Sequence, residues 1–82
     1  MKLYKICQAV NKGYDSYDSA VVAAESEEEA KMIHPNKYVE NWDGNEKDYG
    51  TWTSSENVVV EHLGEAKEGT VKGIIVKSFN AG

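Results

Sequence analysis

The chain has 82 residues, of which 40% are hydrophobic and 28% charged, a composition typical of one folded domain spanning residues 1–82. Nine lysines, without any arginine, stand against fourteen acidic residues and give a formal net charge of −5. This balance argues against a protein that binds duplex DNA or RNA, because such binding depends on cations that neutralise phosphates.

Two short strands are predicted in the first third of the chain. Residues 3–10 (LYKICQAV) and residues 20–24 (AVVAA) are short apolar runs that suit a pleated sheet. Asn11-Lys12-Gly13 follows the first run with residues that tolerate positive φ, which predicts a turn. The connection is too short for a crossover, so we expect the two strands to be antiparallel.

A short helix is predicted to begin after Ser26. Ser26 and Glu29 have the spacing of a capping box, and the acidic residues between them favour the positive end of the helix dipole. Pro35 ends the helix, because the residue before a proline is driven out of the α region. The helix is then about two to two and a half turns long, with Ala30, Ile33 and His34 on one face.

The second half of the chain predicts a long connection and two more strands. Residues 36–55 form a polar stretch that carries several large rings, and residues 57–64 and 70–79 are the third and fourth strands. The order is β-β-α-loop-β-β. We therefore expect an α+β fold, a small and mainly antiparallel sheet with one short helix.

Apolar residues occur on both faces of the predicted sheet. Strict alternation along the strands puts Val60 on one face and Val59 on the other, and it puts Ile74 and Val76 together, opposite Ile75. A helix of about nine residues covers only one face. The aromatic connection or a second subunit would cover the other face, and a second subunit is the simpler solution for a small domain. We therefore expect a homo-oligomer.

The sequence gives little support for metal binding, catalysis or a cofactor. His34, His62 and Cys7 do not have the spacing of zinc ligands, and we expect His34 to favour the C-terminal end of the helix. None of the common catalytic motifs is present, so we expect no enzymatic activity. No apolar run approaches the length of about 20 residues that spans a bilayer, and the first residues lack a signal-peptide core. These patterns predict a soluble cytosolic protein without a membrane partner.

Ligand binding has more support, because five tyrosine and tryptophan residues lie in turn-like or loop segments. Flat nucleobases stack on such rings for about 1–3 kcal/mol each. The alternative is that individual rings simply fill the open side of the sheet. The five residues are Tyr14, Tyr17, Trp42, Tyr49 and Trp52.

The C-terminal segment offers a second set of candidates. Asn80 has an amide that can bind a base edge, and Ser78 can hydrogen-bond a base edge or a phosphate oxygen. Lys72 and Lys77 would offset a ligand that carries about two charges. The alternative interpretation is an edge strand on which lysines discourage aggregation.

Several segments resemble a known family. Residues 14–22 (YDSYDSAVV), His34-Pro35 after a short acidic helix, and residues 78–82 (SFNAG) are similar to very small phage-encoded anti-defence proteins, as are KLYKI at residues 2–6 and GEA at residues 64–66. The best match is the anti-CBASS sponge family, and the likeness covers nearly the whole chain. This resemblance implies an oligomer that sequesters a cyclic dinucleotide (cGAMP-like) immune signal without cleaving it, in the cytoplasm of the infected bacterial host.

The leading hypothesis is therefore a non-enzymatic sponge whose sites form between subunits. The rival hypotheses are an acidic inhibitor that binds a host defence complex by imitating nucleic acid, and a small regulatory phage protein. In the sponge, tyrosine and tryptophan rings stack on the bases, polar residues of the C-terminal strand bind base edge or phosphate, and basic groups compensate charge. The predicted ligand-binding residues are Tyr14, Tyr17, His34, Trp42, Trp52, Lys72, Lys77, Ser78 and Asn80.

Overall fold

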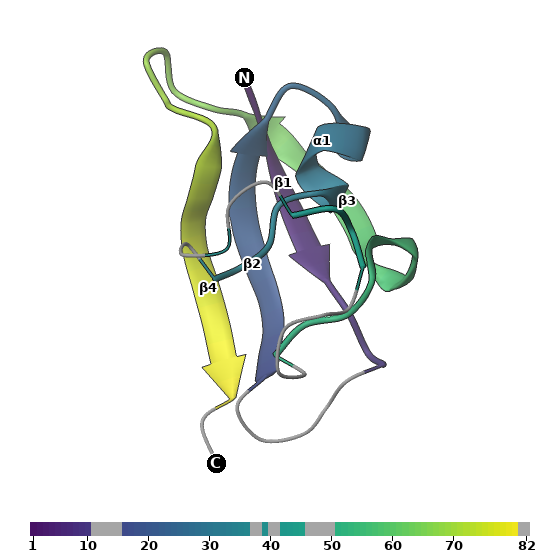
Figure 1. The fold of residues 1–82 in the computed structure, drawn as a ribbon. Coiled ribbons are helices and arrows are strands. Elements are labelled where there is room, and N and C mark those ends of the chain that lie inside the picture. The colour runs from purple at the N-terminus through teal and green to yellow at the C-terminus, as the bar shows by residue number, and fades with distance from the viewer. Residues whose placement is uncertain (11–15, 37–38, 40–41, 46–50, 81–82) are drawn as a thin grey trace.

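Four antiparallel strands and one short helix make up the fold in the computed structural model, which describes residues 1–10, 16–36, 39, 42–45 and 51–80 (Figure 1). The sheet has the order β3-β1-β2-β4, which confirms the expected α+β class. The helices in the described part of the chain are too short to cross a membrane. The elements are β1 (Lys2–Cys7), β2 (Ser16–Ala24), α1 (Glu27–Lys31), the 3-10 turn η1 (Ser55–Asn57), β3 (Val59–Glu65) and β4 (Gly73–Asn80).

The strand register arranges the side chains in rows that cross the whole sheet and alternate between its two faces. We call the face that carries α1 the covered face and the opposite face the open face. The rows His62–Tyr4–Val22–Ile74 and Val60–Ile6–Ala20–Lys77 belong to the covered face. The rows Gly64–Leu3–Ala23–Gly73, Glu61–Lys5–Val21–Val76 and Val59–Cys7–Ser19–Ser78 belong to the open face.

Three irregularities interrupt the alternation, each leaving one residue unmatched: Leu63 in β3, Asp18 in β2 and Ile75 in β4. The extra residue at Ile75 places Ile74 opposite Val22 and Val76 opposite Val21, so these two β4 residues lie on different faces. The expectation that they share a face is wrong, because it assumed an uninterrupted alternation that a β-bulge breaks.

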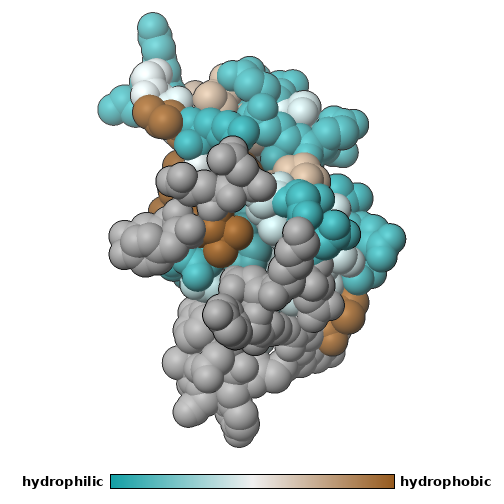
Figure 2. All heavy atoms as spheres, in the orientation of Figure 1, coloured by the Kyte–Doolittle hydropathy of each residue, from teal (hydrophilic) through white to brown (hydrophobic). Residues whose placement is uncertain are grey.

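The hydrophobic core lies on the covered face. Buried strand residues meet Ala30 of α1 and two residues of the connection between α1 and β3, Trp52 and Val58. The described residues of this connection therefore pack on the same face as the helix, and Figure 1 draws them and α1 over the viewer's side of the sheet. In the same view the described surface is mostly hydrophilic, with hydrophobic residues in a few separate places (Figure 2).

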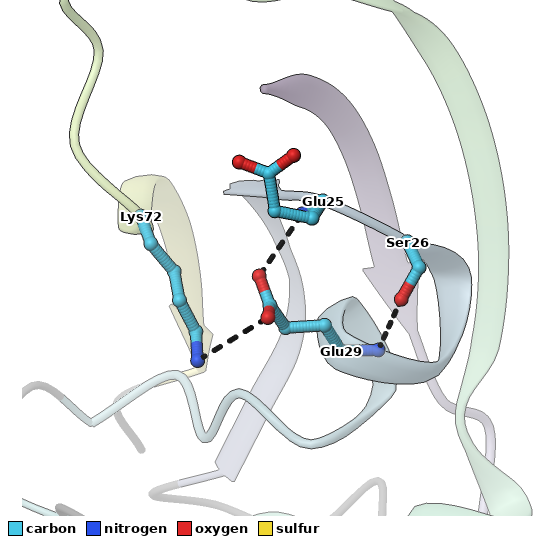
Figure 3. Close-up of polar contacts among 4 residues, drawn as sticks. All are labelled: Glu25, Ser26, Glu29 and Lys72. Carbon is cyan, nitrogen blue, oxygen red and sulfur yellow. Dashed lines mark hydrogen bonds and ion pairs between the residues drawn. The ribbon is translucent and has the colours of Figure 1, made fainter.

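The helix is held by one of the two hydrogen bonds of the predicted capping box, and it is shorter than predicted. The Glu29 backbone N–H donates to Ser26 Oγ at 3.2 Å, and the Glu29 carboxylate accepts from the Glu25 N–H at 2.9 Å. The same carboxylate pairs with Lys72 Nζ at 3.8 Å (Figure 3). Because α1 ends at Lys31, His34 lies beyond the helix, and the expected role of His34 at the helix C-terminus is wrong.

Candidate ligand-binding site

Four of the predicted ligand-binding residues lie in one chain of contacts, which we call the ring row. Its members are Lys77 of β4, Tyr17 of β2, His34 after α1, and Trp42 of the connection. Lys77 Nζ lies 5.3 Å from the centre of the Tyr17 ring, in a cation–π geometry. The Tyr17 and His34 rings meet edge to face at 6.4 Å, and the His34 and Trp42 rings do so at 5.3 Å. Segments distant in the sequence thus meet at one place beside β4.

The β-bulge at Asp18 positions Tyr17. With Asp18 unmatched, both Tyr17 and Ala20 contribute to the core on the covered face, although strict alternation would separate them. The backbone of Tyr17 is fixed on two sides, because its N–H donates to the Thr51 carbonyl at 2.8 Å and its carbonyl accepts from Gln8 Nε2 at 3.0 Å. These two hydrogen bonds fix the backbone of Tyr17 and thereby limit the positions that its ring can take.

His34 is placed by the short turn that follows α1. Its Nδ1 accepts a hydrogen bond from the Asn36 backbone N–H at 3.0 Å, which fixes the plane of the imidazole. In a neutral His34 the ring proton then resides on Nε2.

Trp42 is anchored through its ring nitrogen. Nε1 donates to the Asn45 carbonyl at 2.7 Å, and the Asn45 N–H donates to Asp43 Oδ1 at 3.0 Å. Gly44 makes this tight turn possible with a φ of +86°, and its carbonyl accepts from the Ser55 N–H at 2.7 Å. The indole is therefore oriented by its polar edge, while part of its surface packs against the core and the His34 ring.

The members of the ring row differ in their access to solvent. Tyr17 is 7% exposed and His34 is 4% exposed, so these two rings support their neighbours instead of offering a flat face. Trp42 is half-buried and Lys77 is exposed. A ligand that reaches this place therefore meets an indole at one end of the row and an ammonium group at the other.

The remaining predicted residues lie elsewhere. Trp52 is buried in the core. Lys72 pairs with Glu29 and lies five residues before Lys77, a separation of roughly 16 Å along an extended chain. Ser78 belongs to the open face, where its Oγ lies 3.5 Å from Asp18 Oδ2.

Two further predicted residues complete the set. Asn80 pairs in register with Ser16 at the end of β4, and Tyr14 lies outside the described residues. The structure thus brings together four of the predicted residues, namely Tyr17, His34, Trp42 and Lys77.

Sequence analysis missed two residues that position the ring row. Gln8 is buried, and its side chain bridges the end of β1 to β2 while its Oε1 accepts from the Val10 N–H at 2.9 Å. Asp18 is the bulge residue. The sequence offered two indications, namely a glutamine at the end of an apolar run and an aspartate between Tyr17 and Ser19. Neither pattern predicts a bulge by itself.

Within the described ranges, no three His, Cys, Asp or Glu side chains gather where they could hold a metal ion. Comparisons of the chain with protein-family models, with curated proteins and with solved structures find no match. The site is therefore interpreted from its own geometry.

Proposed function

We propose that the protein is a non-enzymatic sponge that binds a small nucleotide signal of the cyclic dinucleotide class and holds it without cleaving it. In this proposal it is a phage anti-defence protein that acts in the cytoplasm of the infected bacterial host. The observation that carries the proposal is the ring row, in which the half-buried Trp42 and the exposed Lys77 stand at the two ends of a buried aromatic support.

The chemistry of the ring row suits a flat ligand of low charge. A nucleobase that stacks on the Trp42 indole gains about 1–3 kcal/mol, and the Lys77 ammonium offsets a phosphate. A chain with a net charge of −5 repels a long polyanion, whereas a cyclic dinucleotide carries only two negative charges. The burial of Tyr17, His34 and Trp52 assigns these rings to support, so stacking rests on Trp42 in this proposal.

A thermal-shift screen against cyclic dinucleotides and cyclic ADP-ribose tests the proposal. A ligand at a hundred times its Kd stabilises the folded state by about 2.7 kcal/mol, which raises the Tm of a domain of this size by roughly 10 °C or more. Ligand recovered intact by chromatography after denaturation would support sequestration over cleavage.

Two variants and a matched control locate the binding. We expect Trp42→Ala and Lys77→Ala to reduce the ligand-induced Tm shift by half or more, because they remove the stacking face and the phosphate partner. Lys67→Ala removes the same charge from an exposed residue of the β3–β4 connection and should leave the shift unchanged. A screen in which no nucleotide raises the Tm contradicts the proposal and favours the acidic inhibitor, whose binding to a host protein would weaken steeply with salt.

A further inference from the structure

We infer that the open face is the surface through which two copies of this chain associate, back to back, with α1 of each copy pointing outward. The assignment comes from the apolar content, the charge balance and the size of the open face. It is independent of the nucleotide proposal, because it concerns the face opposite the ring row and is tested without a ligand.

The open face carries apolar side chains that the described part of the chain leaves uncovered. Val59 is 62% exposed and Val76 is 59% exposed, and they lie on opposite edge strands of this face. Between them lie the half-buried Leu3 and Val21. α1 and the described residues of the connection pack on the other side of the sheet. Val59 and Val76 therefore stay largely exposed to water, although Ala23 of the same face is fully buried.

The charge on the open face favours a second copy of the same chain. The matched rows of this face hold one cation and one anion, Lys5 and Glu61, which are direct partners across β1 and β3. The unmatched Asp18, whose Oδ2 lies 3.5 Å from Ser78 Oγ on this face, adds a second carboxylate. The face therefore carries about one of the five excess negative charges of the chain, and the acidic first turn of α1 lies on the covered side. In a two-fold arrangement whose axis passes close to this pair, the lysine of each copy would face the glutamate of the other, and the face would be complementary to itself.

The size of the face predicts how tight the association is. Four strands about 4.8 Å apart and about seven residues long give a flat area of roughly 400 Å². A typical stable interface buries about 800 Å² on each partner. The open face is therefore about half the size of a typical stable interface, and we expect a weak dimer that forms only at high concentration.

Sedimentation velocity from low to high micromolar concentration tests this inference. The wild-type chain should shift from monomer toward dimer as its concentration rises. Val76→Lys and Val59→Lys each place an ammonium group in the apolar interface, which costs free energy when it is buried without a partner, so each should raise the dimer Kd about tenfold or more.

Val71→Lys is the matched control. Val71 is 80% exposed but lies in the β3–β4 connection, outside the rows of the open face, so the same substitution there should leave the dimer Kd unchanged. Circular dichroism at a concentration where the protein is monomeric checks that the three variants are folded. We expect them to be, because all three valines are exposed. A wild-type monomer at every concentration, or equal dissociation by Val71→Lys and Val76→Lys, would overturn the inference.

Discussion

The two faces of the sheet are formed by the same four strands, but they differ in how far their apolar side chains are buried. On the covered face, Tyr4, Ile6 and Val22 are buried beneath a five-residue helix and the aromatic connection. On the open face, Val59 and Val76 are as apolar as these neighbours but stay largely in water. The comparison teaches that the described part of this chain covers one side of its sheet and leaves apolar residues exposed on the other side.

The ring row lies on the covered side, where the connection between α1 and β3 brings its members together. Its members meet only because the connection returns across the sheet and hydrogen-bonds the β2 backbone, from Tyr17 N–H to the Thr51 carbonyl. The open face has no such returning segment in the described residues, and its charged pair, Lys5 and Glu61, lies within the sheet itself. A ligand site and an association surface can therefore coexist on opposite sides.

The largest effect expected from this comparison comes from replacing a buried isoleucine, with an exposed isoleucine as the control. Ile6 is fully buried on the covered side, and Ile75 is 52% exposed at the β4 bulge. Ile6→Ala should lower the free energy of unfolding by about 2–5 kcal/mol, because it leaves a cavity in the core. Ile75→Ala should lower it by less than about 1 kcal/mol. Urea unfolding monitored by tryptophan fluorescence measures both values, and comparable losses would contradict the described difference in burial between the two isoleucines.

An intermediate effect is expected where the connection closes over the covered face. Gly44 has a φ of +86°, and a Cβ built there would lie 2.7 Å from Ser55 Oγ and 3.1 Å from Met32 Cε. Gly44→Ala should therefore cost about 1–3 kcal/mol, through both backbone strain and crowding.

Gly69→Ala is the control for this position. Gly69 has a similar φ of +90°, but a Cβ there would meet nothing within 4 Å, so only the backbone strain of about 1 kcal/mol is expected. The difference between the two unfolding free energies isolates the crowding around Gly44. If Gly69→Ala destabilised the protein as much as Gly44→Ala does, the connection would not be tightly fitted over the helix end.

Local patterns predicted much of the fold, because they depend on neighbouring residues. The capping box at Ser26 and Glu29 and the strand order along the chain are of this kind. The bulges at Asp18 and Ile75 could not be predicted, since a bulge depends on how two strands fit after they have paired. For the same reason Tyr17 was expected in a turn-like segment and lies in the core instead.

The candidate site was predicted in composition but not in arrangement. Sequence alone identified Tyr17, His34, Trp42 and Lys77 as chemically suitable, but their proximity depends on the return of the connection over the sheet. The burial of Trp52 likewise depends on which side of the sheet this segment crosses, and no local pattern encodes that choice.

The smallest effect is expected at the edge of the covered face, where Lys72, the residue before β4, pairs with Glu29 of α1. Its Nζ lies 3.8 Å from the Glu29 carboxylate, and both side chains are partly exposed. Lys72→Ala should lower the free energy of unfolding by about 0.2–1 kcal/mol, because solvent and salt screen an exposed pair. Glu29→Gln should cost less than Glu29→Ala, because its amide oxygen can still accept from the Glu25 N–H while the charge is lost.

A double-mutant cycle between Lys72→Ala and Glu29→Gln, measured by urea unfolding at low and high salt, separates the ion pair from the cap. We expect the coupling energy to fall as salt rises, while the cost of losing the cap in Glu29→Ala stays nearly constant. A coupling larger than about 1 kcal/mol that salt does not reduce would mean that Lys72 holds the helix on the sheet. The helix would then be attached to the edge strand β4 through this pair, and the pair would be better shielded from solvent than the exposed fractions of its two side chains indicate.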